Sequence, residues 1–316
     1  MKAVVTGAAG FVGSHLCEHL LDAGDTVVGI DCLTDYYDPA LKQANLRLLA
    51  GRQGWTSVHA DLLTMPLDDV IADADVVFHL AGQPGVRASW GEEFHTYVRQ
   101  NVLVTQRLLE SVRRHPVWKL VFASSSSVYG NAESYPTVET MRPQPVSPYG
   151  VTKLAAEHLC GVYCDNFGVP AASLRFFTVY GPRQRPDMAF SRLVAGAVSA
   201  TPFTLYGDGS QTRDFTYVGD IVTALRRAAL SPWTGVANLG GGNRVSMIEV
   251  IETIGELAGV PVSLVWKEKQ DGDVRHTAAD TTVAREGFGY QPQTTLREGL
   301  AAMIGAARVR RAAVPA

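Results

Sequence analysis

A tyrosine and a lysine, Tyr149 and Lys153, lie in the stretch SPYGVTK at residues 147–153. The pattern predicts a helix over Pro148–Phe167, and a spacing of i, i+4 places the two side chains on one helix face. A tyrosine with its usual pKa of about 10 is a poor base at neutral pH, but a neighbouring ammonium favours the phenolate. The pair could therefore move a proton to and from a substrate hydroxyl. An ordinary amphipathic helix, with the tyrosine in the core and the lysine in solvent, is the alternative.

A run of serines precedes this helix in the sequence. Residues 121–130 read VFASSSSVYG, so the predicted strand Leu120–Ser124 is followed directly by Ser125, Ser126 and Ser127. A serine hydroxyl at the end of that strand can share a proton with the tyrosine and with a substrate oxygen. The sequence thus contains a complete set of hydroxyl, phenol and ammonium groups.

A glycine-rich turn near the N-terminus predicts a dinucleotide site. Residues 6–13 read TGAAGFVG, where the strand Ala3–Thr6 should turn into the helix Val12–Ala23. Gly7, Gly10 and Gly13 would allow a tight turn, backbone approach to a pyrophosphate, and close packing of helix on strand. The helix N-terminus would present free N–H groups and a positive dipole end to the phosphates. A tight turn without a ligand is the alternative.

An acid at the end of the second predicted strand favours one dinucleotide over the other. Asp31 ends the strand Thr26–Asp31 and follows Gly13 at close to the spacing of about 20 residues that a ribose-binding acid requires. Its carboxylate would accept hydrogen bonds from ribose hydroxyls and repel a 2′-phosphate. We therefore expect NAD rather than NADP, although Asp31 could also be a solvated turn residue. The positive nicotinamide of NAD would further favour the Tyr149 phenolate.

The elements that would position these groups alternate between strand and helix in the first half of the chain. Further strands are expected over Ser57–Ala60, Asp75–Leu80 and Ala172–Phe177, and further helices over Leu41–Leu49 and Glu93–Arg114. Strands that are apolar throughout imply a parallel sheet covered on both faces, which is the doubly wound α/β fold of the Rossmann type. Ligands bind at the carboxyl ends of such strands. The predicted cofactor residues are Gly7, Gly10, Phe11, Val12, Gly13, Asp31, Asp61, Leu62, Leu80, Ala81, Tyr149 and Lys153. His79 ends a strand there too, but a buried histidine with a structural role is the favoured interpretation.

A smaller α/β substrate lobe is expected after residue 180, where the rhythm breaks into a loop rich in proline and arginine. Helices are predicted over Phe190–Ala200, Val218–Leu230, Ser246–Ala258 and Thr295–Ala307. We expect Arg308, Arg310 and Arg311 to lie in a frayed end. The predicted domains are 1–177 for the NAD-binding domain, with 214–240 returning to it, and 178–316 for the main part of the substrate lobe.

Composition argues against several classes of protein. The 316 residues are 46% hydrophobic, which is enough to bury a core. A net charge of −3 gives no cationic field for nucleic acid, no early stretch approaches the roughly 20 apolar residues of a membrane span, and the apolar run after Lys2 is too short for a signal peptide. Four cysteines are too few for a disulfide framework, and Cys160 and Cys164 with His158 nearby rarely suffice for zinc. We expect a cytoplasmic protein with a small-molecule partner and no metal.

In this order, the glycine loop, the serines and Tyr-x-x-x-Lys resemble the extended short-chain dehydrogenase/reductase family, specifically its nucleotide-sugar epimerases and dehydratases. The similarity covers nearly the whole chain and includes RFFTVYGP at 175–182, YGDGSQTRDF at 206–215 and GDVR at 272–275. It implies that Ser125 is the catalytic hydroxyl, Tyr149 the general base, and Lys153 the residue that holds the nicotinamide ribose and lowers the pKa of Tyr149. It also implies a homodimer through the helices at 93–114 and 148–167, although their apolar faces could simply be core.

The same resemblance suggests residues that bind a UDP-sugar. Thr178 falls where the family contacts the diphosphate, Arg213 where an arginine pairs with it, and Tyr206 beside the base. Asp273 and Arg275 fall near the ribose and phosphate of the nucleotide, although a surface salt bridge is the alternative for Arg275. An arginine suits a phosphate because its fork donates two aligned hydrogen bonds. The complete predicted substrate set is Arg87, Ser125, Ser126, Ser127, Tyr149, Thr178, Arg185, Arg192, Tyr206, Gln211, Arg213, Asp273 and Arg275.

The serine run also bears on the reaction. Dehydratases and decarboxylases of the family typically carry an acid near the second hydroxyl position, where this chain has only serines at 125–127. Without a second acid or base, oxidation and re-reduction at C4 remain, and epimerisation is the simplest outcome. Segments 81–90 and 181–192 look like those of UDP-glucuronate 4-epimerases and carry several arginines. A desolvated sugar carboxylate needs such a donor. Arg192 is the first choice and Arg185 the second, although either could bind phosphate or an internal acid.

The leading hypothesis is therefore an isomerase of carbohydrate metabolism that converts UDP-glucuronate to UDP-galacturonate through a transient 4-keto intermediate, with NAD as cofactor. A 4-epimerase of neutral UDP-glucose or UDP-N-acetylglucosamine is the alternative. A net NAD-dependent dehydrogenase or reductase ranks below both, and a noncatalytic protein ranks last.

Overall fold

A sheet of seven parallel strands organises the larger part of the chain in the computed structural model, which describes residues 1–242, 244–268 and 276–312. Its strand order is β10-β6-β5-β4-β1-β2-β3. The strands are β1 (Lys2–Thr6), β2 (Thr26–Asp31), β3 (Trp55–His59), β4 (Val76–His79), β5 (Lys119–Ser125), β6 (Ala171–Phe176) and β10 (Gly235–Leu239). All neighbouring pairs are parallel. The predicted doubly wound α/β fold is confirmed, and every strand predicted in the first half of the chain is present.

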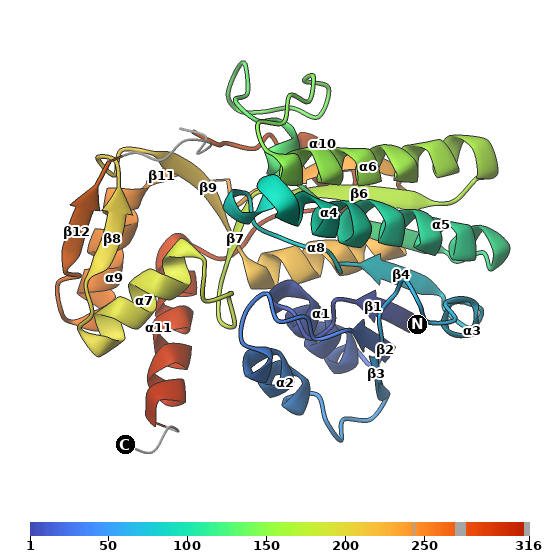
Figure 1. The fold of residues 1–316 in the computed structure, drawn as a ribbon, viewed down its shortest axis with the longest axis horizontal. Helices are drawn as coiled ribbons and strands as arrows, with labels where there is room; N and C mark the ends of the chain where they lie inside the picture. The colour runs from blue at the N-terminus through green and yellow to red at the C-terminus, as the bar shows by residue number, and fades with distance from the viewer. Residues whose placement is uncertain (243, 269–275, 313–316) are drawn as a thin grey trace.

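Helices cover both faces of this sheet (Figure 1). One face is covered by α1 (Phe11–Asp22) and α8 (Val218–Leu230), the other by α5 (Val104–Arg114) and α6 (Pro148–Phe167). Successive side chains of a strand point to opposite faces, so Val4 packs with α5 and α6 while Val5 packs with α1 and α8. Each fully buried side chain of this size contributes about 1.5–3 kcal/mol. This is why the strands had to be apolar on both sides.

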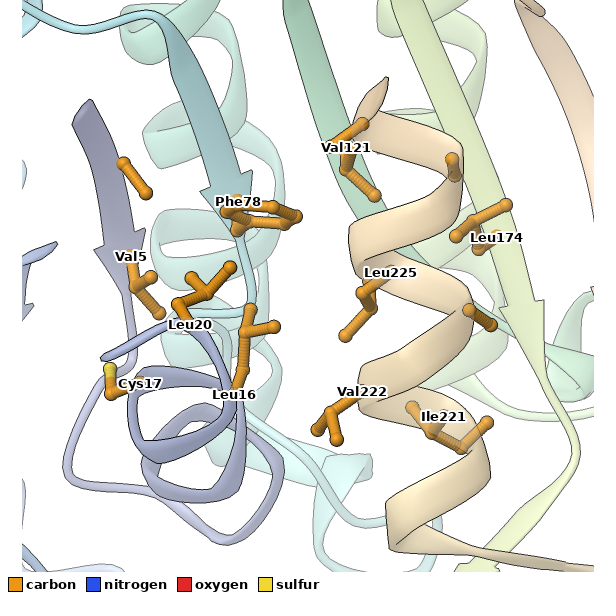
Figure 2. Close-up of a cluster of buried hydrophobic side chains, with 14 of the residues drawn as sticks. Val5, Leu16, Cys17, Leu20, Phe78, Val121, Leu174, Ile221, Val222 and Leu225 are labelled. Carbon is orange, nitrogen blue, oxygen red and sulfur yellow. The ribbon is translucent and has the colours of Figure 1, made fainter. Parts of the chain in front are cut away.

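The packing between α1, α8 and the sheet holds the glycine turn in place. Figure 2 shows Leu16 and Leu20 of α1 beside Phe78 of β4, with Leu225 of α8 facing them. All of these side chains are buried. Because α1 begins directly after the glycine turn, its packing fixes where that turn lies at the carboxyl edge of the sheet.

The predicted helix Glu93–Arg114 is interrupted. It consists of α4 (Phe94–Tyr97), the π-helical turn η3 (Val98–Leu103) and α5. The remaining short elements of this part are α2 (Pro39–Arg47), α3 (Asp68–Ile71) and the 3₁₀ turns η1 (Arg87–Ser89), η2 (Gly91–Glu93) and η4 (Ser126–Val128). The wide turn brings Asn101 to a buried position, where it contacts the loop after β4 and helix α6.

The smaller lobe contains two short sheets and three helices. Its strands, in the orders β11-β9-β7 and β12-β8, are β7 (Thr178–Tyr180), β8 (Phe203–Tyr206), β9 (Thr212–Tyr217), β11 (Arg244–Ser246) and β12 (Leu264–Lys267). Its helices are α7 (Ala189–Ser199), α9 (Met247–Ala258) and α11 (Leu296–Ala312), and they share one apolar cluster. Helix α10 (Thr282–Phe288) instead packs against β10 and α8.

Two features of the second half bear on the sequence predictions. Strand β10 joins the large sheet by pairing with β6, and helix α8 packs against that sheet. The exact domain limits stay a prediction. The prediction of a frayed end at Arg308, Arg310 and Arg311 is wrong, because α11 continues to Ala312. Arg308 donates to the carbonyl of Ala258 (2.9 Å) and Arg311 to that of Val198, near the C-terminal ends of α9 and α7. Cationic side chains stabilise the unpaired carbonyls there.

No helix in the described ranges is long and apolar enough to cross a membrane.

Candidate active site

A cavity of about 460 Å³ lies along the carboxyl edge of the large sheet. Every predicted cofactor residue lines it, from Gly7 at the first turn to Lys153 on α6. Ser125, Ser126, Ser127, Thr178 and Arg185 of the predicted substrate set line it as well. The fold therefore brings the predicted cofactor residues and part of the predicted substrate set to one site.

The glycine turn has the shape that a pyrophosphate requires. Gly7 has a φ of +73°, and a Cβ on it would lie 2.8 Å from the backbone nitrogen of Ala81. A Cβ on Gly13 would lie 2.0 Å from the carbonyl oxygen of Gly7. No side chain fits at either position. Helix α1 starts immediately after Gly10 with no side-chain cap, so its first N–H groups remain for a bound phosphate.

Asp31 lies in the cavity at the end of β2. One carboxylate oxygen accepts from the backbone nitrogen of Ala9 (3.0 Å) and the other from that of Leu33 (2.8 Å). These bonds fix the carboxylate as an acceptor and leave lone pairs for ribose hydroxyls. Lys42 also lines the cavity, and its ammonium donates to the carbonyl (2.8 Å) and hydroxyl (2.9 Å) of Thr34. No motif in the sequence had indicated Lys42.

Replacing Asp31 by alanine is expected to weaken NAD binding roughly tenfold to a hundredfold, since a hydrogen bond to a charged group contributes about 1.5–3 kcal/mol. Asp31→Asn keeps one oxygen acceptor but removes the charge that repels a 2′-phosphate, so its preference for NAD over NADP should shrink. Calorimetric titration of both dinucleotides measures this. Asp22→Ala, which removes an exposed acid of α1, is the control and should bind as the wild type does. A wild type that prefers NADP would contradict the assignment of Asp31.

Tyr149 and Lys153 project from the first turns of α6. Ser147 caps this helix by accepting from the backbone nitrogen of Gly150 (3.1 Å), and Pro148 occupies its first turn. The buried Lys153 ammonium donates to the carbonyl of Ala123 on β5 (2.9 Å). The predicted helix limits, 148–167, are confirmed. Both side chains reach the cavity, so the amphipathic-helix alternative with Lys153 in solvent is wrong.

Ser125 links the serine run to the tyrosine. Its hydroxyl oxygen accepts from the backbone nitrogen of Ser127 (3.1 Å), and its side chain hydrogen-bonds to Tyr149. Burial raises the pKa of Tyr149, while the hydrogen bond from Ser125 and the charge of Arg185 lower it. Burial also lowers the pKa of Lys153, to about 8. A phenolate at neutral pH therefore requires additional positive charge, and an oxidised nicotinamide in this cavity fits that requirement.

The two arginines proposed for a sugar carboxylate lie in different places. Arg185 lines the cavity and donates two hydrogen bonds to Asp187, 3.0 Å from Nε and 2.9 Å from Nη2. Arg192, on α7, lies with its guanidinium 5.4 Å from the ring centre of Phe203 and does not contribute to the cavity lining. The structure therefore places the second choice, Arg185, in the cavity and the first choice, Arg192, outside its lining. Arg185 lies in the loop before α7 and Arg192 lies in the first turn of α7. The sequence alone does not show which of the two faces the cavity.

Four further predicted substrate residues, Arg87, Tyr206, Gln211 and Arg213, do not contribute to the cavity lining. Arg87, in η1, has its guanidinium 5.2 Å from the ring centre of Tyr206 at the end of β8, so the two lobes meet there. Gln211 donates to the carbonyl of Tyr206 (3.2 Å). Arg213 is the second residue of β9. Asp273 and Arg275 fall outside the described residues. Tyr36 also lines the cavity, and no motif in the sequence indicated it. Gln83 and Met188 line the cavity as well; they lie in the segments 81–90 and 181–192 but were not among the predicted site residues.

Comparison with known proteins identifies the family. Residues 3–240 match the NAD dependent epimerase/dehydratase family. The chain is 45% identical to an uncharacterized UDP-glucose epimerase, YtcB, of Bacillus subtilis, over 95% of this chain and 96% of that protein. It is 36% identical to a UDP-glucuronate 4-epimerase of Thermodesulfobacterium geofontis, over 94% and 93%.

Solved structures agree with this match. The crystal structure of UDP-glucuronic acid 4-epimerase from Bacillus cereus, in complex with UDP-glucuronic acid and NAD, superposes with a TM-score of 0.94. It is 42% identical and covers 98% of this chain and 100% of that chain. The glycine turn, the acid after β2 and the Tyr-Lys pair in one cavity agree with the family match, and this chain belongs to the NAD dependent epimerase/dehydratase family.

Proposed function

We propose that this chain is a UDP-glucuronate 4-epimerase, which forms UDP-galacturonate through a 4-keto intermediate. The observation that carries the proposal is the presence of Arg185 in the same cavity as Ser125, Tyr149 and Lys153. A guanidinium beside the proton-transfer group suits a sugar that carries a carboxylate at C5. The resemblance to the Bacillus cereus enzyme, solved with UDP-glucuronic acid and NAD, supports the same substrate.

The residues of the cavity can perform both halves of the reaction. The glycine turn, Asp31 and Lys153 would hold NAD, which would supply the hydride acceptor and donor for C4. Tyr149 takes the proton of the C4 hydroxyl during oxidation and gives it back during reduction. Ser125 donates a hydrogen bond that stabilises the phenolate, and Lys153 holds the nicotinamide ribose and adds positive charge below pH of about 8.

Inversion at C4 requires the sugar to present its other face while the nucleotide stays held. We assign the diphosphate to Thr178 in the cavity and to Arg213 on β9, and the base to Tyr206 at the end of β8. These residues belong to strands of the smaller lobe, whereas the proton-transfer groups belong to the large sheet and α6. The sugar can therefore turn against the large domain while its anchor remains on the smaller one.

A 4-epimerase of neutral UDP-glucose is the second candidate. YtcB, at 45% identity, bears the name of a UDP-glucose epimerase. The related protein MoeE5 was solved with NAD and either UDP-glucose, at 41% identity, or UDP-glucuronic acid, at 42%. Incubation of the purified protein with UDP-glucuronate, UDP-glucose and UDP-N-acetylglucosamine, with products resolved by NMR, separates the candidates. Conversion of UDP-glucose but not UDP-glucuronate would overturn our choice.

Turnover is expected without net formation of NADH, because the hydride returns to the sugar that lost it. The protein should purify with NAD at least partly bound, and the absorbance of NADH should stay flat while the epimer accumulates. A steady rise in that absorbance on addition of external NAD would instead identify a dehydrogenase.

The working form is proposed to be a cytoplasmic homodimer. Helix α6 exposes Val151 and Val162, which are 47% and 52% accessible and lie on one face of the helix, and a second copy could cover this face. All four cysteines are free thiols, as is usual in a reducing compartment. Light scattering on the purified protein tests the dimer, and a monomer at micromolar concentration would contradict it.

A further inference from the structure

A chain of buried hydrogen bonds runs beneath the cavity without contributing to its lining. Its members are Thr6 at the end of β1, His79 at the end of β4 and Thr105 on α5, which are 0%, 1% and 1% exposed. The Thr6 hydroxyl lies 2.8 Å from Nδ1 of His79, and the Thr105 hydroxyl lies 3.0 Å from Nε2. The imidazole thus bridges two hydroxyl groups from different elements.

The direction of each hydrogen bond follows from its neighbours. The Thr105 hydroxyl donates its single proton to the carbonyl of Asn101 (2.6 Å), so it can only accept from His79. Nε2 of His79 must therefore carry a proton. A neutral ring then has a bare Nδ1, which accepts from the Thr6 hydroxyl. That hydroxyl in turn accepts from the backbone nitrogen of Ala81 (3.1 Å).

The ring is neutral over the working range of pH. Burial and the nearby positive charge of Lys153 lower the pKa of His79 to about 3. A second ring proton would face the Thr6 hydroxyl, which would then have to redirect its own proton in a buried site. All donors and acceptors of Thr6, His79 and Thr105 are therefore satisfied only when the proton of the neutral His79 ring is on Nε2.

The chain continues from Asn101 to the catalytic helix. The Asn101 side chain accepts from the backbone nitrogen of Gln83 (2.7 Å) and donates to the hydroxyl of Thr152 (3.0 Å). Thr152 donates to the carbonyl of Tyr149 itself (2.9 Å). A Cβ on Gly82 would lie 2.8 Å from Oδ1 of Asn101, so the loop and the Asn101 side chain are closely packed and there is no room for a larger residue at position 82. The network thus connects the loop 80–83, which lines the cavity, to the backbone of the general base.

We propose that His79 is a positioning residue: its Nε2–H imidazole, held between Thr6 and Thr105, keeps the loop 80–83 and the first turn of α6 at a fixed separation. A histidine suits this position because its donor and acceptor lie on opposite edges of a rigid ring. An apolar residue would leave both threonine hydroxyls without this partner. The activity part of the inference rests on the proposed function, whereas the tautomer does not.

The tautomer can be observed directly in the wild-type holoenzyme. With histidines labelled with ¹⁵N, and with His79→Gln to assign the signals, multiple-bond ¹H–¹⁵N spectra should show a protonated Nε2 and a bare Nδ1. The signals should not titrate between about pH 5 and about pH 9, where an ordinary histidine changes charge. A protonated Nδ1, or a titration in that range, would overturn the assignment.

A matched pair at Thr105 tests the positioning role. Thr105→Val has nearly the same shape but lacks the hydroxyl, so the Nε2 proton of His79 loses its acceptor and its resonance should move upfield. Misplacement of the tyrosine by a fraction of an ångström should lower kcat roughly tenfold to a hundredfold. KM for the UDP-sugar should stay near the wild-type value, because Thr105 does not line the cavity. Thr105→Ser retains the hydroxyl and should restore both the resonance and kcat.

Several outcomes would reject the positioning role. These are an unchanged kcat in Thr105→Val, or equal losses in the valine and serine variants when circular dichroism reports native folding. If Thr105→Val does not fold, the pair Thr6→Ser and Thr6→Val repeats the test at the other side of the ring. A wild type that turns over only UDP-glucose would refute the proposed substrate but not this inference, since the same comparison can be made with that sugar.

Discussion

Tyr149→Phe is expected to lose nearly all turnover, by about 10²- to 10⁴-fold in kcat, while retaining its fold and both ligands. The substitution removes only the hydroxyl that takes the C4 proton. The ring remains, and so does its edge contact with Tyr97, whose centre lies 6.3 Å away. Ser125→Ala should lose less, because it removes a hydrogen bond to the phenolate rather than the base itself. Turnover measured by NMR, with folding checked by circular dichroism, tests both variants.

The pH dependence gives a second readout for Tyr149. Burial raises its pKa, so the phenolate fraction increases as pH rises toward that pKa, and kcat of the wild type should rise from about pH 6 to about pH 8. Above about pH 8 Lys153 begins to lose its charge, which we propose supports the phenolate, so the rise should flatten. Any residual activity of Tyr149→Phe should lack this rise. Near-wild-type turnover by that variant would eliminate Tyr149 as the base.

Arg185→Ala is expected to lower kcat/KM for UDP-glucuronate roughly tenfold to a hundredfold, and to lower kcat/KM for UDP-glucose by less. A charged hydrogen bond contributes about 1.5–3 kcal/mol, which corresponds to that range. The bonds of Arg185 to Asp187 use Nε and Nη2, so the hydrogens on Nη1 remain for a substrate carboxylate. Arg185→Lys keeps the charge but loses the fork and should recover only part of the activity.

The same variant should also change the products. Oxidation of UDP-glucuronate at C4 creates a β-keto acid, which loses carbon dioxide when its C–CO₂ bond aligns with the carbonyl π system. A positioned guanidinium can hold the carboxylate away from that alignment. Arg185→Ala is therefore expected to release some decarboxylated 4-keto pentose, which mass spectrometry detects.

Arg192→Ala is the matched control for this experiment. It removes the same type of side chain from the same segment, but its guanidinium lies over Phe203 and outside the cavity lining. It should leave the ratio of activities on UDP-glucuronate and UDP-glucose unchanged. A change of that ratio in Arg192→Ala, with none in Arg185→Ala, would show that Arg192 and not Arg185 binds the sugar carboxylate.

Local chemistry made much of this site predictable from the sequence. The glycines at 7 and 13 are required by close backbone contacts within the first turn, so the pattern itself reveals them. Strands that are apolar throughout, with no alternation of apolar and polar residues, indicate a parallel sheet covered on both faces. Pro148 after Ser147 marks the start of α6. Asp31 was found because it ends a strand at a distance from the glycine turn that the βαβ unit dictates.

The tertiary structure decided what depends on contacts between distant parts of the chain. Strand β10 joins the sheet by pairing with β6, and its short sequence carries no period that reveals this partner. The hydrogen bonds of Asn101 to Gln83 and Thr152 accompany a π-helical turn that helical periodicity does not predict. Arg185 and Arg192 have the same chemistry and lie in one segment, so only the path of the chain between β7 and α7 brings Arg185 into the cavity. Residue type and spacing determine which groups can react, but nonlocal packing determines which of them meet.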